Sequence, residues 1–130
     1  RWSIMIESAE IKNPILQFYE KEASGGVLEF AERFYSRQEG LLFIGTDPEE
    51  WLVDRASIIS LYKETANPGV EIRISDLVAY SEGTVGWAAD RVKVILPNRS
   101  EVLVRHTFIL HKEEEEWKIV HIHISIAGSD

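Results

Sequence analysis

Four long segments in the second half of the chain have the alternating composition of β-strands, and only short turns separate them. We predict strands at Val70–Ser81, Thr84–Leu96, Glu101–Lys112 and Glu116–Ile126. Short turns join antiparallel neighbours, because a parallel connection needs a crossover of about a dozen residues or more. A chain with this pattern has to build an antiparallel meander, and the rest of the sequence has to cover one face of it.

The first half of the chain has helical periodicity, which predicts helices at Pro14–Glu22, Val27–Ser36 and Asp54–Thr65. Asn13 is the expected N-cap of the first helix, and its apolar side is formed by Leu16, Phe18 and Tyr19. The segments between and after the helices are expected to be a short strand at Leu41–Gly45, a turn with one short helical turn at Thr46–Trp51, and a helix terminator at Asn67-Pro68-Gly69. Helices followed by strands are typical of the α+β class, and 130 residues fit one domain over residues 1–130.

Composition excludes several classes of function. The chain has no cysteine, which rules out disulfides, thiol nucleophiles and cysteine–metal sites. A net charge of −8 argues against nucleic acid and anionic membranes as partners. The uncharged stretches are too short to span a bilayer, and Arg1–Ile6 lacks the features of a signal peptide. We therefore expect a cytoplasmic protein, and nothing in the sequence calls for a cofactor.

The last predicted strand has the sharpest alternation in the chain, and it defines the two faces of the sheet. The row that we expect to pack on the helices is aliphatic and consists of Val120, Ile122, Ile124 and Ile126. The opposite row, on the outer face, consists of Ile119, His121, His123 and Ser125. A three-residue turn at Glu113–Glu115 would place His106 opposite Ile122 and Phe108 opposite Val120, so both would point inward.

The preceding hairpin extends this inner row to an acidic residue. If Asn98, Arg99 and Ser100 form its loop, Val92 faces His106 and Asp90 faces Phe108. A loop one residue different would turn Arg91 and Lys93 inward instead. Extending the same register to the first strand turns Asp76 inward as well.

Three segments resemble bacterial SnoaL-like proteins of the nuclear transport factor 2-like superfamily: Ile44–Trp51, Gly86–Arg91 and Trp117–Ser125. The last of them also resembles the terminal strand of the association domain of calcium/calmodulin-dependent kinase. The resemblance covers nearly the whole chain. It implies a cone-shaped, curved antiparallel sheet, with four long strands and a short one, wrapped around three helices and enclosing a small pocket. Members include isomerases, dehydratases, polyketide cyclases, transport factors and oligomerisation domains, so the fold alone assigns no activity.

The chain also departs from these relatives. The kinase association domain has an arginine where this chain has Ile124 and another near Phe108, so its anion-binding pocket is not reproduced, although Arg91 could occupy a third such position. Neither the Asp and Tyr pair of the ketosteroid isomerases nor the Asp–His pair of scytalone dehydratase can be matched residue by residue.

His106 and Asp90 are the candidate catalytic residues. A neutral imidazole can accept and donate protons near pH 7, and a carboxylate in apolar surroundings is a usable general base. The alternatives are a core histidine with its hydrogen bonds satisfied and an aspartate that pairs with Arg91 or Arg73 on the rim. Expected pocket residues are Phe43, Trp51, Tyr62, Asp76, Trp87, Arg91, Phe108, Ile122 and Ile124.

His121 and His123 share one strand face, as a metal-binding pair would, but zinc needs further ligands, and we expect no metal. The resemblance implies instead that this face forms a dimer, and its expected interface residues are Thr107, Ile109, Ile119, His121 and His123. Two functions then compete. In the first, the chain binds a small, largely apolar organic molecule, and any transformation of it is cofactor-free acid–base chemistry. In the second, the chain is a non-catalytic dimerisation or ligand-binding module.

Overall fold

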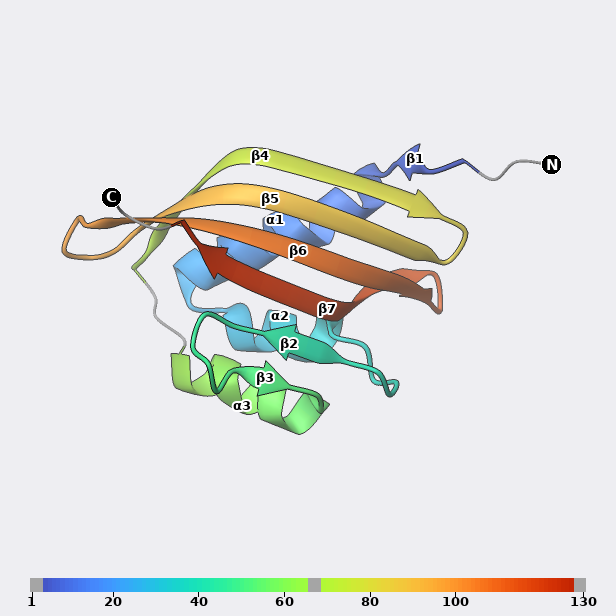
Figure 1. Cartoon of the computed structure of the whole chain (residues 1–130), viewed down its shortest axis with the longest axis horizontal. Helices are drawn as coiled ribbons and strands as arrows, with labels where there is room; N and C mark the ends of the chain where they lie inside the picture. Colours follow the sequence, from blue (N-terminus) through green and yellow to red (C-terminus); the bar gives the residue numbers. More distant parts are fainter. Residues whose placement is uncertain (1–3, 66–68, 128–130) are drawn as a thin grey trace.

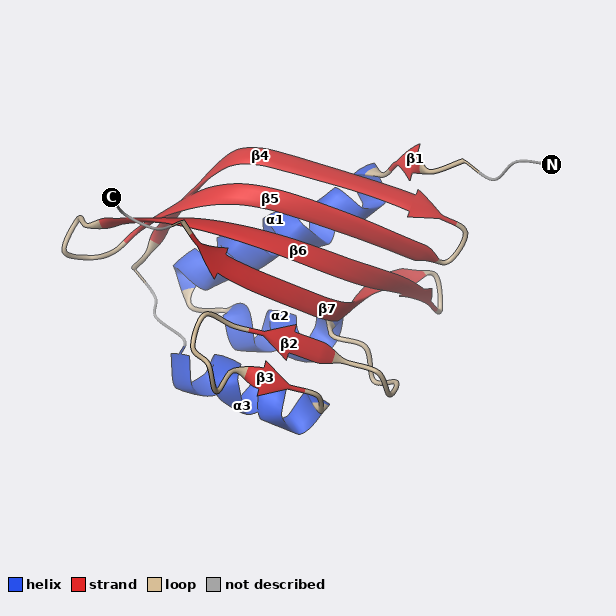
Figure 2. Ribbon diagram, in the orientation of Figure 1, coloured by secondary structure: helices blue, strands red, loops and turns tan. Residues whose placement is uncertain are grey.

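The computed structural model describes residues 4–65 and 69–127, which form three helices and a curved sheet of seven strands (Figure 1). The helices lie together on one side of the sheet, as expected for the α+β class (Figure 2). In chain order the elements are β1 (Ile6–Glu7), α1 (Ala9–Ser24), α2 (Val27–Phe34), β2 (Leu42–Ile44), β3 (Trp51–Leu52), α3 (Arg55–Thr65), β4 (Glu71–Glu82), β5 (Val85–Ile95), β6 (Glu101–Glu113) and β7 (Glu116–Ile126).

The sheet order is β1-β4-β5-β6-β7-β2-β3, so the predicted meander β4 to β7 forms its centre. The pairs within the meander are antiparallel, whereas β2 joins the last strand, β7, in parallel. No helix of the described residues has the length and apolar character needed to cross a membrane.

Helix α1 begins at Ala9 rather than at Pro14, because Ser8 caps it. The Ser8 Oγ accepts a hydrogen bond from the Ile11 backbone N–H at 3.2 Å, which satisfies one of the unpaired donors of the first turn. Asn13 and Pro14 therefore lie inside the helix, and the prediction of Asn13 as N-cap is wrong. The side facing the sheet carries Ile11, Ile15, Phe18 and Tyr19, whereas Leu16 is 44% exposed.

Helix α3 has the predicted N-cap, since Asp54 Oδ1 accepts a hydrogen bond from the Ser57 N–H at 2.8 Å. That bond is the main reason why the pKa of Asp54 is lowered. Asn67 and Pro68, which the sequence predicts to end this helix, lie outside the described residues, as do Arg1 to Ser3.

The turn between β6 and β7 is tighter than predicted. Glu113 pairs with Glu116, and only Glu114 and Glu115 form the turn, with φ of 51° and 65°. Farther along, the register shifts between Ile109 and Leu110, where a bulge leaves Val120 without a cross-strand partner.

This bulge changes which side chains face the helices. Between the β6–β7 turn and the bulge, Trp117 and Ile119 point into the core. After the bulge, Ile122 and Ile124 do so. Ile119 is only 1% exposed, so the prediction that it lies on the outer face is wrong. Ile126, predicted to point inward, is 50% exposed.

A second bulge, between Ile74 and Asp76 in β4, overturns another prediction. It places Asp76 on the outer face, where its Oδ2 accepts a hydrogen bond from Arg91 Nε at 2.8 Å. Neither Asp76 nor Arg91 therefore belongs to an inner pocket. In the neighbouring pair, Asp90 lies directly opposite His106 and Val92 opposite Val104.

Candidate functional site

Three polar side chains from three elements meet in the core between α1 and the sheet. Tyr19 comes from α1, Asp90 from β5 and His106 from β6. The Tyr19 hydroxyl donates a short hydrogen bond to Asp90 Oδ2, and its oxygen lies 3.0 Å from His106 Nδ1. His106 Nδ1 lies 2.8 Å from Asp90 Oδ1. The Asp90 carboxylate therefore bridges the two other side chains, one oxygen to each.

The hydrogen bonds define which nitrogen of His106 is available for chemistry. The Asp90 side chain has no exposed surface, so its carboxylate needs donors from the protein. Tyr19 O–H and His106 Nδ1–H supply them. In the neutral imidazole a proton on Nδ1 leaves Nε2 as an acceptor, and no described residue hydrogen-bonds to Nε2.

Tyr19 remains protonated in this cluster, since its hydroxyl donates to Asp90. Burial, reinforced by the negative charge of Asp90, raises the pKa of Tyr19 far above its ordinary value. The phenol therefore keeps its proton throughout the physiological range, and it holds Asp90 in place without itself exchanging a proton.

A small cavity of about 120 Å³ lies beside the cluster, and His106 forms part of its wall. Asp90 does not line it. The cavity residues come from all three helices and from β2, β6 and β7, and they are Phe18, Glu22, Val27, Phe43, Tyr62, Thr65, His106 and Ile124. His106 is thus the member of the buried cluster that a molecule in the cavity would touch.

Glu22 adds a carboxyl group to the cavity wall. It follows Tyr19 by three residues on the same side of α1. Burial raises the pKa of Glu22, and the nearby His106 opposes this effect more weakly. The cavity therefore holds one carboxyl group and one imidazole among mostly apolar and aromatic side chains.

Tyr62, which lines the cavity, forms a hydrogen-bonded pair with Tyr35. The Tyr62 hydroxyl, from α3, lies 2.9 Å from that of Tyr35. Burial raises the pKa of both phenols, so the pair stays neutral. The Tyr62 ring also meets the rings of Phe18 and Phe43 edge to face.

The predicted pocket residues separate into three groups in the structure. Phe43, Tyr62 and Ile124 line the cavity. Phe108 and Ile122 are fully buried in the core without lining it, although the Phe108 ring stacks on His106 at 5.6 Å between centroids. The other four predictions are wrong, because these side chains lie away from the cavity. They are Trp51, Asp76, Trp87 and Arg91.

Each of these errors has a local cause. Trp51 lies on β3 at the sheet edge and is 61% exposed, because the predicted turn after Thr46 leads into a short edge strand that begins at Trp51. Trp87 alternates with the inward-pointing Ala88 and therefore lies on the outer face, where its ring stacks on Tyr80.

Sequence reasoning missed Tyr19 and Glu22 as site residues. Both lie on the stripe of α1 that carries Ile11, Ile15 and Phe18 toward the sheet. Their position on an otherwise apolar stripe could have identified them, because a hydroxyl or a carboxyl group that faces the core needs a partner there. Helical periodicity alone identifies Tyr19 only as an apolar member of the helix.

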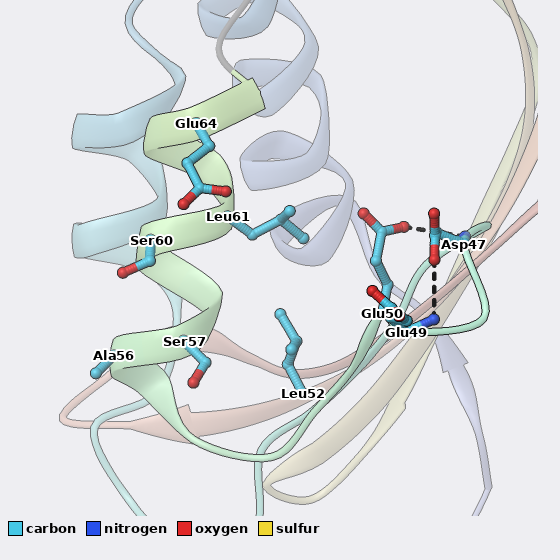
Figure 3. Close-up of a pocket in the computed structure, with 9 residues that line it drawn as sticks. All are labelled: Asp47, Glu49, Glu50, Leu52, Ala56, Ser57, Ser60, Leu61 and Glu64. Carbon is cyan, nitrogen blue, oxygen red and sulfur yellow. Dashed lines mark hydrogen bonds between the residues drawn. The ribbon is translucent and has the colours of Figure 1, made fainter.

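A larger, open hollow of about 500 Å³ lies between α3 and the connection from β2 to β3 (Figure 3). Its acidic residues are Asp47, Glu49, Glu50 and Glu64. Asp47 and Glu50 are occupied in organising the turn, where Asp47 Oδ1 accepts from Glu49 N–H and Glu50 Oε1 accepts from Asp47 N–H. This hollow is separate from the cavity beside His106.

The outer face of the sheet carries most of the predicted interface residues. Thr107, Ile109 and His123 are exposed there, with Ile109 at 41%. His121 is half-buried, and its Nδ1 bonds to the Leu42 carbonyl at 3.0 Å. In the part of the chain that the structure describes, no three His, Cys, Asp or Glu side chains gather as a metal site.

Solved structures with the same fold include proteins of several kinds. A candidate dehydratase of the nuclear transport factor 2-like family from Streptomyces avermitilis has a TM-score of 0.80 and 14% identity, with 92% of this chain and 95% of that chain covered. A candidate ketosteroid isomerase from Parabacteroides distasonis has a TM-score of 0.75 and 15% identity, covering 90% and 85%. A candidate calcium/calmodulin dependent protein kinase II association domain from Xanthomonas campestris has a TM-score of 0.74 and 17% identity, covering 93% and 88%.

At these identities the likeness establishes the fold alone. A comparison with curated proteins finds no match. The sequence itself matches the family model of the SnoaL-like domain over residues 11–129, which includes every residue of the cavity and of the buried cluster. The chain therefore belongs to the SnoaL-like domain family, with the fold of the nuclear transport factor 2-like proteins.

Proposed function

We propose that this domain binds a small, largely apolar organic molecule in the cavity and that His106 moves a proton on it. The observation that carries the proposal is the fixed imidazole. Nδ1 is held by Asp90 and Tyr19, while Nε2 has no partner among the described residues and the ring forms part of the cavity wall. A histidine held in this way is oriented for acid–base work.

The proton transfer needs only the residues of the cluster. Neutral His106 accepts a proton from the ligand at Nε2 and becomes an imidazolium, whose Nδ1–H remains bonded to the Asp90 carboxylate. The imidazolium then returns the proton to another atom of the ligand, so no oxidant or metal enters the balance. Asp90 was predicted to touch the ligand; since it does not line the cavity, we assign it and Tyr19 as positioning residues.

The size of the cavity limits the ligand. Ordinary small-molecule sites have volumes of roughly 300–1,000 Å³. The volume here, about 120 Å³, is closer to that of a cavity of roughly 150 Å³ known to hold benzene. The ligand class is therefore a single small ring or a short branched chain. The candidate dehydratase and the candidate ketosteroid isomerase with this fold have names consistent with proton-transfer chemistry.

Protein purified from its own host tests this proposal. Native mass spectrometry should show a retained molecule of the stated size, and NMR in deuterium oxide should show that the protein exchanges one of its protons. His106→Gln should slow the exchange by about 100-fold or more, because it removes the acid–base group.

The matched control is His111→Gln. His111 lies on the same strand but near the β6–β7 turn, where its Nδ1 faces Glu113, so its replacement should leave the exchange unchanged. A retained molecule whose exchange is unaffected by His106→Gln would overturn the role of His106. An empty cavity in protein from the native host would overturn the binding proposal itself.

We also propose that the outer sheet face forms a homodimer. The support is a set of large apolar side chains that remain exposed on it at 38–53%: Val78, Val85, Trp87, Leu103 and Ile109. Sedimentation at micromolar concentration should show a dimer, and Ile109→Glu should convert it to monomer by placing an unpaired charge in the contact. Val53→Glu is the control, since Val53 is 60% exposed away from this face. A monomeric parent protein would contradict the proposal.

A further inference from the structure

The Glu22 side chain is half-buried at the cavity wall, yet none of the described residues pairs with its carboxylate. It takes part in no ion pair or hydrogen bond with them, whereas Asp90, deeper in the core, has two donors. A charged group removed from water without a partner costs free energy. Because the carboxylate belongs to the cavity wall, a ligand in the cavity is placed to supply that partner.

Three aromatic rings line the same cavity and are oriented differently around it. The Phe18 ring meets that of Tyr62 at 70°, with 6.0 Å between centroids, and the Phe43 ring meets it at 77° and 6.1 Å. The face of an aromatic ring attracts a cation through its quadrupole, most strongly where water is excluded. The aromatic walls of the cavity therefore accept either an apolar group or a positive one.

The charges around the cavity have the same sign. None of the described residues that line it is a lysine or an arginine. Behind His106 lies the Asp90 carboxylate, and the whole chain has a net charge of −8. Such a distribution raises the local concentration of cations and repels anions.

We propose that the cavity selects a small organic ammonium ion, with its hydrocarbon part against the aromatic rings and its charged nitrogen against Glu22. This inference rests on the proposed function, because it names the ligand class of the same cavity. A neutral ligand offers the Glu22 carboxylate at most a hydrogen bond and no compensating charge, and an anionic one would add repulsion. A cation alone compensates the carboxylate and also uses the ring faces.

Three probes with the same hydrocarbon ring differ in charge, and the amine and the alcohol also have equal numbers of non-hydrogen atoms. Cyclopentylamine is a cation at neutral pH, cyclopentanol is neutral with the same number of non-hydrogen atoms as benzene, and cyclopentanecarboxylate is an anion. Calorimetry at pH 7 should give an affinity for the amine about tenfold or more above that for the alcohol, which corresponds to about 1.4 kcal/mol, with the carboxylate weakest.

Two variants of α1 show whether Glu22 makes this selection. Glu22→Gln keeps the shape of the side chain and removes its charge, so the amine should lose its advantage over the alcohol. Glu20→Gln removes the same charge from an exposed position of the same helix and should leave the advantage unchanged.

The outcomes separate this inference from the proposed function. Equal affinities for amine and alcohol in the parent protein would overturn the ammonium assignment and leave a cavity for neutral molecules. An amine preference that survives Glu22→Gln would overturn the role of Glu22. Failure of all three probes to bind would overturn both the ammonium assignment and the small-molecule cavity.

Discussion

At the scale of single residues, the site consists of a buried carboxylate with two donors and a second carboxylate with no donor among the described residues. Asp90 accepts from Tyr19 and His106, and its cost of burial is offset by those bonds. Glu22 has no such compensation among the described residues. Hydrogen bonds therefore compensate the burial of Asp90, whereas the burial of the Glu22 carboxylate lowers the stability of the native state.

Removal of the Tyr19 hydroxyl should show how strongly the buried cluster is coupled. Tyr19→Phe should cost about 1–2 kcal/mol of unfolding free energy and Asp90→Asn about 3 kcal/mol, since each leaves a buried partner unsatisfied. The double variant should cost about 1 kcal/mol less than the sum, as measured by urea unfolding. Tyr80→Phe, on the outer face, should instead be additive with Asp90→Asn, and additivity at Tyr19 would contradict the described hydrogen bond.

Because the pKa of Glu22 is raised, we expect the stability of the fold to depend on pH. Burial favours the protonated form in the folded state, so folding takes up a proton and stability falls as pH rises from the ordinary glutamate range through the raised pKa. Glu22→Gln should therefore be more stable than the parent at pH 7, by about 1 kcal/mol. The difference should vanish in acid, where the parent is protonated in both states.

Unfolding in urea at several pH values measures this difference. The exposed Glu20, on the same helix, provides the control variant Glu20→Gln, which should track the parent at every pH. If the difference in unfolding free energy between Glu22→Gln and the parent stayed constant across the pH range, the ionisation of Glu22 would not be its cause.

At the scale of the elements, periodicity located the four long strands and the short strand β2, but it placed the start of α1 five residues too late, at Pro14 instead of Ala9. The strand Glu116–Ile126 was predicted with its observed bounds, and the other strands of the meander differ from prediction by one residue at one or both ends. The strands β1 and β3 have two residues each, too few for any period, and the two bulges leave no mark in composition. Local signals therefore located the sheet but not its irregularities.

The same reasoning explains why Asp90 and His106 were identified although their register was not. Asp90 was predicted opposite Phe108 and lies opposite His106, which is a slip of two residues. A slip of two keeps every side chain on its face, whereas a slip of one would reverse them all. Ile119 was misplaced because a bulge is a slip of one. Tyr19 and Glu22 were missed because strand alternation says nothing about the helix that covers the sheet.

The turn from β6 to β7 offers a stabilising change. Glu114 and Glu115 both have a positive φ, a backbone conformation that residues other than glycine and asparagine rarely adopt. The double substitution Glu114→Asn with Glu115→Gly should remove this strain and raise stability by about 0.5–1 kcal/mol, visible as a higher Tm. The control change Glu49→Asn, at a turn where Glu49 has no positive φ, should give no gain. An unchanged or lower Tm in the first variant would contradict the strain.

At the scale of the whole molecule, the site depends on how closely α1 approaches the sheet. Gly86 of β5 marks that approach, because a Cβ there would overlap Ile11 Cδ1 and lie 2.9 Å from the Tyr80 carbonyl oxygen. The same helix carries Tyr19 to Asp90 and Glu22 to the cavity. Packing at one end of α1 therefore determines the geometry of the site at the other.

Gly86→Ala should test this dependence. We expect a loss of about 2 kcal/mol or more, since the added methyl forces α1 away from the sheet. Ile11→Val removes the overlapping Cδ1 and should restore part of the loss in the double variant, although it destabilises the parent on its own. Thermal unfolding measures all four proteins, and a simple sum of the two single effects would show that α1 does not pack against Gly86 as described.

The parallel pairing of β2 with β7 also orders events during synthesis. Residues Leu42–Ile44 pair with His121–His123, and β7 is made after every other described element. While the chain is emerging from the ribosome, the helices and the long hairpins can form, but the strand that closes the cavity, with Ile124 in its wall, is still absent. The strand β2 therefore lacks its parallel partner, and the part of the core that β7 covers stays open to water, and to chaperones, until translation of this domain is almost complete.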